Sequence, residues 1–249
     1  MAGSVLIYAA LAFGFVGTLA LVRPLSCLYL PTRRHAATVL GLAALLFVAA
    51  ALLPAPNHRV PTPLTRLDEF IPTWQFAERH EIRVQARPDQ VEEAVRQVTA
   101  REIRLFRLLT WIRRPRLPTT APAGDILAPS PDKPILDVAL GSGFFLLAEE
   151  RNREVVFGTI VIAPAGAASL PAERVRDLAD PGYAKAVMNF LLTDGGNGWT
   201  LLTTETRIFA TDRATARRFA VYWRLIYPGS SLIRQNWLAA IRDRAEGSS

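Results

Sequence analysis

The 249 residues carry a formal net charge of +7, and half of them are hydrophobic. The first sixty residues contain four arginines and no acidic side chain, so they hold +4 of this charge and leave +3 for the rest. That remainder is too weakly basic to indicate a nucleic-acid partner. The single cysteine, Cys27, excludes an intramolecular disulfide and any metal site built from several cysteines. No motif in the sequence implies a cofactor.

Two apolar segments near the start of the chain, at 5–22 and 36–53, contain no charged side chain. Each has the ~17 to 25 apolar residues that cross a bilayer, so we predict a transmembrane helical hairpin over 1–55, with the lipid bilayer as a partner. A cleaved signal peptide is the alternative interpretation of the first segment, although no positively charged region precedes it. Three arginines between the segments favour a cytoplasmic loop, which places the following domain outside the cytoplasm.

Residues 56–73 are rich in proline and polar side chains, which predicts an extended linker before a folded domain over 74–246. Alternation over 75–86 indicates a first strand, and Pro88 then begins a short helix. A capping box of Thr99 and Glu102 begins a second helix, whose arginines either face solvent or contact an anionic membrane. These arginines are Arg101, Arg104 and Arg107.

The middle of the chain combines a long loop with short strands. A proline-rich stretch over 114–134 predicts a lid, a binding loop or a mobile segment. After a helical turn, the pattern predicts a β-hairpin, a short helix and two further strands joined by a glycine-rich turn. The predicted segments are 135–140, 144–150, 155–162, 172–178, 183–193 and 199–210.

The last predicted strand runs directly into a long amphipathic helix that begins near Asp212. Apolar side chains recur there at i, i+3, i+4 and i+7, and the stripe continues in phase beyond Pro228. Because Pro228 removes one helical hydrogen bond without shifting the period, we expect one kinked helix or two nearly collinear helices that pack on the sheet. The stripe comprises Phe219, Tyr222, Trp223, Ile226, Ser230, Ile233, Trp237 and Ile241.

Strands 183–193 and 199–210 each have one apolar face and one mixed face. If their apolar faces coincide, residues of equal parity pair, and four polar side chains share the opposite face. These either line a cavity and orient a ligand carbonyl or carboxylate, or form a salt-bridge ladder in solvent. Because charged pairs are rarely buried, we favour the ladder. The four residues are Lys185, Asn189, Glu205 and Arg207.

The order of one strand, two short helices, a run of antiparallel strands and a long C-terminal helix resembles the helix-grip fold of the START-like (SRPBCC) superfamily. This superfamily includes lipid-transfer domains and aromatic polyketide cyclases. The resemblance implies an α+β fold and a sheet wrapped around the long helix with a cavity between them. The strings look like those of uncharacterised bacterial members, and together with the apolar hairpin this predicts a bacterial inner (plasma) membrane location. It implies no catalytic residue, because the superfamily has no universal catalytic motif. The strings that carry it are VTAREI (98–103), YAKAVMNF (183–190), TTETR (203–207) and YWRLIYPGS (222–230).

The leading hypothesis is a membrane-anchored domain that binds a hydrophobic lipid, isoprenoid or polyketide-like molecule between sheet and helix. One alternative is a cyclase or dehydratase of the same superfamily, with Glu205 or Lys185 as acid or base. The other is a structural or protein-interaction module of the cell envelope. We interpret His80 as an ordinary exposed strand residue, since no second ligand or catalytic partner stands at a suitable spacing. Besides the four polar residues, the candidate ligand-binding side chains are Met188, Phe190, Phe219, Tyr222, Trp223, Ile226 and Trp237.

Overall fold

The computed structural model describes residues 2–23, 29–104, 106, 132–167 and 170–247. The chain divides into two compact units. The hairpin unit contains Met1–Ala55 and Arg217–Pro228, and the sheet unit contains Pro56–Ala216 and Gly229–Ser249. Both units therefore include part of one long helix, α8 (Arg213–Gly247), which has Pro228 inside it.

Among the described residues of the hairpin unit, two helices are long and apolar enough to cross a membrane. They are α1 (Ala2–Val22) and α2 (Arg33–Leu52). The helices approach closely at Gly17, where a β-carbon would lie 2.8 Å from Cγ of Leu40. Buried alanines recur every seven residues along α2, a spacing that keeps one face against a partner and lets the backbones approach. They are Ala36, Ala43 and Ala50.

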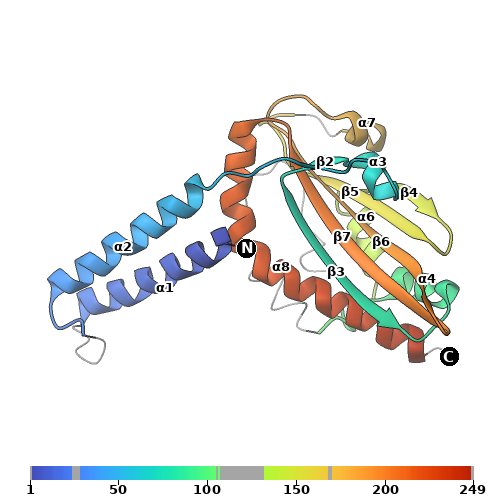
Figure 1. Ribbon diagram of the computed structural model, residues 1–249, viewed down its shortest axis with the longest axis horizontal. Helices are drawn as coiled ribbons and strands as arrows, with labels where there is room; N and C mark the ends of the chain where they lie inside the picture. The colour runs from blue at the N-terminus through green and yellow to red at the C-terminus, as the bar shows by residue number, and fades with distance from the viewer. Residues whose placement is uncertain (1, 24–28, 105, 107–131, 168–169, 248–249) are drawn as a thin grey trace. The chain divides into compact units, whose positions relative to one another are not determined.

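In the described part of the sheet unit, five strands form one antiparallel sheet in the order β3-β7-β6-β5-β4 (Figure 1). The predicted α+β architecture with an antiparallel sheet and a long C-terminal helix is confirmed at this level. Residues of equal parity pair between β6 and β7, as predicted, with Met188 opposite Thr206 and Asn189 opposite Glu205. The strands are β3 (Phe76–Val84), β4 (Phe144–Glu150), β5 (Glu154–Ile162), β6 (Ala184–Gly196) and β7 (Trp199–Ala210), with a separate pair, β1 (His58–Arg59) and β2 (Thr73–Trp74).

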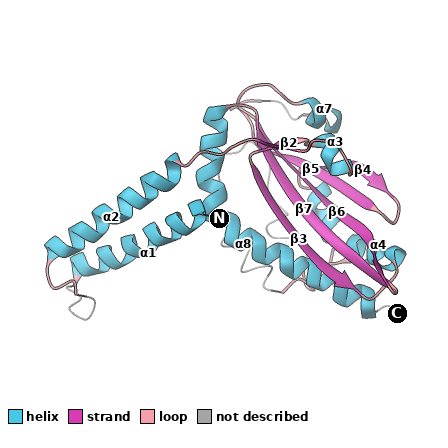
Figure 2. Ribbon diagram, in the orientation of Figure 1, coloured by secondary structure: helices cyan, strands magenta, loops and turns pink. Residues whose placement is uncertain are grey.

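One face of the sheet, which we call the first face, carries the larger hydrophobic core. Figure 2 shows the strands of the sheet and the helices around it. The first face is covered by α4 (Pro88–Gln97), α6 (Ile135–Leu140) and residues 229–247 of α8. Phe190 of β6 and Ile241 of α8 are fully buried there. Each large apolar side chain removed from water in this way contributes roughly 1.5–3 kcal/mol.

The second face of the sheet is covered by two short helices, α3 (Arg66–Phe70) and α7 (Ala172–Asp177). Leu67 and Ile71 contact this face and are almost completely buried. The sequence predicted an extended linker over 56–73, but β1 and α3 form within this stretch, and its Leu67 and Ile71 pack on the sheet.

A capping box explains how so short a helix as α3 begins. Thr65 accepts a hydrogen bond from the backbone N–H of Asp68, and the Asp68 carboxylate accepts one from the backbone N–H of Thr65. We call residues 64–71, which contain α3 and its caps, the strap.

The second predicted helix is described only at its start. Glu102 accepts hydrogen bonds from the N–H and the hydroxyl of Thr99, each at 2.8 Å, so only half of the predicted capping box forms. The backbone N–H of Glu102 donates to the carbonyl oxygen of Thr99 at 3.2 Å instead of to its hydroxyl. Arg101 at this start pairs with Asp132 at 3.1 Å. The rest of that helix, Arg107 included, and most of the predicted loop over 114–134 lie outside the described residues.

Candidate functional site

Lys185 of β6 is buried on the second face, with 4% of its surface exposed. Its ammonium group donates hydrogen bonds to the carbonyl oxygens of Val175 (2.7 Å), Arg176 (2.6 Å) and Phe70 (3.4 Å). These carbonyls lie in the last turns of α7 and α3, where helix carbonyls attract a cation. Burial lowers the pKa of Lys185 to about 8, and the charge of Asp177 offsets part of this effect. Lys185 therefore holds both short helices on the sheet.

Asn189 connects β6 to the start of α3 through Glu154 of β5. Its amide group donates to the Glu154 carboxylate at 2.6 Å, and its side-chain oxygen accepts from the backbone N–H of Glu205 at 3.0 Å. The same carboxylate accepts from the backbone N–H groups of Arg66 (2.7 Å) and Leu67 (3.1 Å), which begin α3. Three donors and the positive end of a helix thus compensate a carboxylate that is only 1% exposed.

Arg207 of β7 joins two carboxylates on the same face. Its guanidinium group pairs with Asp68 at 2.6 Å and Glu205 at 2.5 Å, and its Cζ lies 4.0 Å from the ring centroid of Trp74. Burial alone would raise the pKa of Asp68. Hydrogen bonds from two backbone N–H groups of the strap and from Arg207 outweigh burial and hold that pKa below its ordinary value.

The predicted polar face is therefore a closed network rather than a solvent-exposed ladder. Its charges are compensated by the strap, by α7 and by neighbouring strands, and we call it the strap network. Replacing a buried charged network with apolar side chains is often neutral for stability, whereas removing one partner from it is strongly destabilising. The network comprises Asp68, Glu154, Lys185, Asn189, Glu205 and Arg207.

The apolar candidates are divided between the two units. Met188, Phe190 and Trp237 lie in the first-face core, where the rings of Phe190 and Trp237 meet edge to face with 5.2 Å between centroids. Sheet and helix are thus in direct contact at this position. The remaining four side chains belong to the stretch of α8 in the hairpin unit, so the structure does not gather all seven in one unit. These four are Phe219, Tyr222, Trp223 and Ile226.

Sequence reasoning missed a polar cluster inside the first-face core. Glu78 of β3, 4% exposed, accepts a hydrogen bond from the hydroxyl of Ser230 at 2.9 Å. Its other oxygen lies 2.8 Å from Nε2 of His80, and the hydroxyl of Ser231 lies 3.3 Å from the same nitrogen. The His80 side chain is only 15% exposed, so its interpretation as an exposed strand residue is wrong.

This cluster does not have the geometry of a Ser-His-acid triad. In such a triad the two ring nitrogens have separate partners, whereas Ser231 and Glu78 both approach Nε2 of His80. The only signal in the sequence is the i, i+2 spacing of Glu78 and His80, which places both on one face of β3. We interpret the cluster as a structural contact between β3 and α8.

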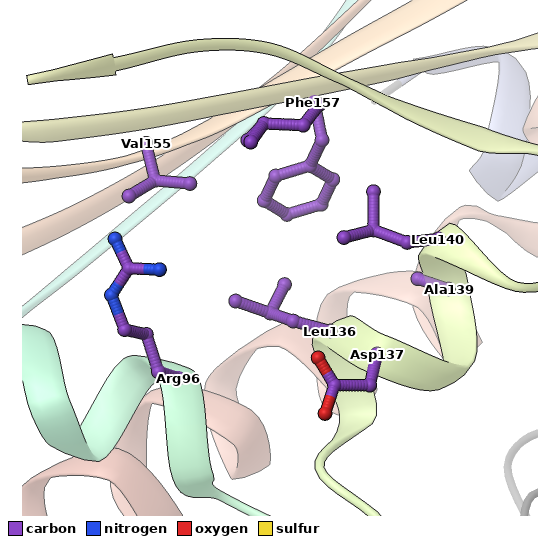
Figure 3. Close-up of a pocket in the computed structure, with 8 residues that line it drawn as sticks. Arg96, Leu136, Asp137, Ala139, Leu140, Val155 and Phe157 are labelled. Carbon is purple, nitrogen blue, oxygen red and sulfur yellow. The ribbon is translucent and has the colours of Figure 1, made fainter.

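A cavity of about 80 Å³ lies between α4, α6, β4 and β5 (Figure 3). Figure 3 shows the side chains of Phe157, Val155 and Leu136 directed toward one space. Leu140 and Leu146 are 42% and 47% exposed, so the cavity reaches the surface beside them. Its lining residues are Arg96, Leu136, Asp137, Ala139, Leu140, Leu146, Val155 and Phe157.

Arg96 of α4 is the fixed cation of this cavity. Its guanidinium group pairs with Glu92 at 2.9 Å and also with Glu149 of β4. Glu92 in turn accepts a hydrogen bond from the backbone N–H of Asn152, at the β4–β5 turn. Because Glu92 and Glu149 compensate its charge and Asp137 also lines the cavity, Arg96 is suited to donate a hydrogen bond to a neutral carbonyl group of a ligand.

Among the described residues, no group of three or more His, Cys, Asp or Glu side chains is arranged to hold a metal ion. No protein-family model matches the chain, and no curated protein matches it. The geometry thus offers an apolar cavity with one oriented cation, and a strap network that lies on the other face of the sheet.

Proposed function

We propose that this chain is a membrane-anchored binding domain that holds the apolar end of a lipid, isoprenoid or polyketide-like molecule. The observation that carries the proposal is the apolar cavity between α4, α6, β4 and β5. Two N-terminal helices that are long and apolar enough to cross a bilayer support the anchoring. Arg23, Arg33 and Arg34, at the loop end of the hairpin, favour a cytoplasmic loop and an extracytoplasmic sheet unit, and we propose the inner membrane as the location.

We also propose a helix-grip fold related to the START-like superfamily. Two observations support it: the first strand of the sheet pairs with the last, β3 with β7, and residues 229–247 of α8 pack on one face. The ligand position proposed here differs from the one expected from the resemblance. At Phe190 and Trp237 the helix touches the sheet directly, whereas the cavity lies toward the β4 edge.

The size of the cavity limits what it accepts. Pockets that enclose a whole drug-sized ligand measure ~300–1,000 Å³. A cavity of about 80 Å³ takes only the end of a chain, and the rest of the ligand lies across the exposed Leu140 and Leu146. The Arg96 guanidinium is placed to contact a polar group near that end.

Native mass spectrometry of the full-length chain in detergent tests the proposal. We expect a retained mass that is released on denaturation and identified as an apolar chain compound. Leu146→Trp should reduce the fraction of chains that retain the ligand about tenfold or more. The indole ring would fill the mouth of the cavity and occupy the volume that the end of the ligand needs. Leu232→Trp is the matched control, since Leu232 is 50% exposed on α8 and does not line the cavity. Equal retention by both variants would contradict this position, and an empty wild-type chain would contradict the function.

The second candidate is an interaction module of the cell envelope, favoured by the direct contact of helix and sheet at Trp237. It predicts an empty chain in the same experiment and a protein partner instead. The enzyme alternative is less well supported, because Glu205 and Lys185 lie in the strap network and do not line the cavity.

A further inference from the structure

Residues 217–228 of α8 contact both helices of the hairpin within the hairpin unit. Arg224 donates hydrogen bonds to the carbonyl oxygens of Ala50 (2.6 Å) and Leu53 (2.9 Å), at the C-terminal end of α2. The last carbonyls of a helix lack intrahelical donors, so a guanidinium group is a favourable partner there. Arg224 is 8% exposed and is therefore fixed at the end of the hairpin.

The N-terminal end of α1 meets the same stretch. Gly3 leaves room for the side chain of Arg224, since a β-carbon at Gly3 would lie 2.6 Å from its Cδ. The hydroxyl of Tyr8 donates a hydrogen bond to the carbonyl oxygen of Leu225 at 2.7 Å. The start of α1 and the end of α2 thus both contact residues 217–228. In Figure 1 this stretch crosses the ends of the two helices and does not continue along them.

A helix that crosses the ends of two membrane-spanning helices lies in the plane of the bilayer surface. Its composition suits the headgroup layer, where Tyr side chains and arginines are favoured. Tyr222 and Tyr227 are half-buried, whereas Arg217 and Arg218 are exposed. No acidic residue occurs in the sequence from 213 to 242, so this surface has one sign of charge.

We infer that residues 217–228 form an interfacial segment whose exposed arginines, Arg217 and Arg218, bind the phosphate groups of membrane phospholipids. A planar guanidinium group matches phosphate oxygens with two parallel hydrogen bonds. The surface lies at the end of the hairpin marked by Gly3 and Leu53. This inference rests on the proposed membrane insertion of α1 and α2, and it is independent of any ligand in the cavity.

Two measurements on the full-length chain test the inference in vesicles of phosphatidylcholine and phosphatidylglycerol. In the first measurement, the native cysteine is removed by Cys27→Ser and a nitroxide label is attached to the cysteine introduced by Arg218→Cys. The relaxation of the nitroxide is then compared between nickel held by a chelating lipid and nickel held by a soluble chelate. We expect the lipid-tethered nickel to relax the nitroxide more strongly.

In the second measurement, native mass spectrometry counts the phosphatidylglycerol molecules that the Arg217→Gln/Arg218→Gln variant retains. One arginine near an anionic surface changes affinity about fivefold, so the double variant should lose about tenfold or more.

Arg151→Gln/Arg153→Gln, on the β4–β5 turn, removes the same charge and should keep wild-type lipid retention. A nitroxide that responds only to the soluble chelate would overturn the interfacial position. Equal loss of phosphatidylglycerol in both double variants would overturn the role of Arg217 and Arg218. Extraction of the wild-type chain from the vesicles by alkaline carbonate would show that the hairpin does not insert, and would overturn this inference while leaving ligand retention in the cavity unaffected.

Discussion

Lys185 makes the stability of the sheet unit depend on pH. Its pKa is about 8 in the folded chain, against an ordinary value of 10.5. Below about pH 8 the lysine is protonated in both the folded and the unfolded states, so its contribution is constant. Between about pH 8 and 10.5 the unfolded chain binds more protons than the folded one, and the free energy of unfolding therefore rises with pH. Urea unfolding of the full-length chain in detergent at several pH values measures this rise.

The chain has a matched control, because its other lysine, Lys133, is exposed. Lys185→Met should abolish this part of the rise, whereas Lys133→Met should retain it. An identical pH dependence in both variants would show that Lys185 is not responsible.

The sequence predicted that Lys185, Asn189, Glu205 and Arg207 share a face, because strand residues alternate with period two. It did not predict their burial, which depends on α3 and α7, two short helices that precede them in the chain.

The strap shows how a short element is fixed by single side chains. Arg207→Met leaves the buried Asp68 without its guanidinium partner, and breaking one side of a buried pair costs ~3–5 kcal/mol. We expect a loss of this size in the free energy of unfolding and faster hydrogen exchange in residues 64–71. Arg79→Met is the control, since Arg79 is 58% exposed and its pair with Glu81 contributes ~0–1 kcal/mol. A loss below ~1 kcal/mol for Arg207→Met would mean that the strap does not depend on this pair.

The long elements and the short helices α6 and α7 were predictable, whereas α3 was not, for a physical reason. The period of β7 or of α4 is repeated over enough residues to identify the strand or helix. The five residues of α3 contain little more than one turn, and the helix is held by Thr65, Asp68 and the distant Glu154. A proline-rich composition therefore indicated a linker where tertiary contacts form a helix. The stripe of α8 was correct in period, but periodicity does not say which partner each part of a helix contacts.

At the scale of the whole molecule, Cys27 reports the orientation of the hairpin, because it is the only cysteine and lies between the apolar helices. We expect a membrane-impermeant thiol reagent to leave Cys27 unlabelled in intact cells and to label it in inverted membrane vesicles. A Cys27→Ser/Ser249→Cys chain should show the opposite pattern if the sheet unit is extracytoplasmic. Labelling of Cys27 in intact cells would reverse the orientation.

The cavity beside Leu146 is proposed to hold an apolar small molecule, and photocrosslinking in the native membrane identifies what occupies it. The full-length chain would carry benzoylphenylalanine in place of Leu146 or, as the control, in place of Leu232. We predict that irradiation at position 146 gives a small-molecule adduct of defined mass, and that position 232 does not give it. A protein adduct at position 146, or the same lipid adducts at both positions, would contradict the claim and favour an interaction module.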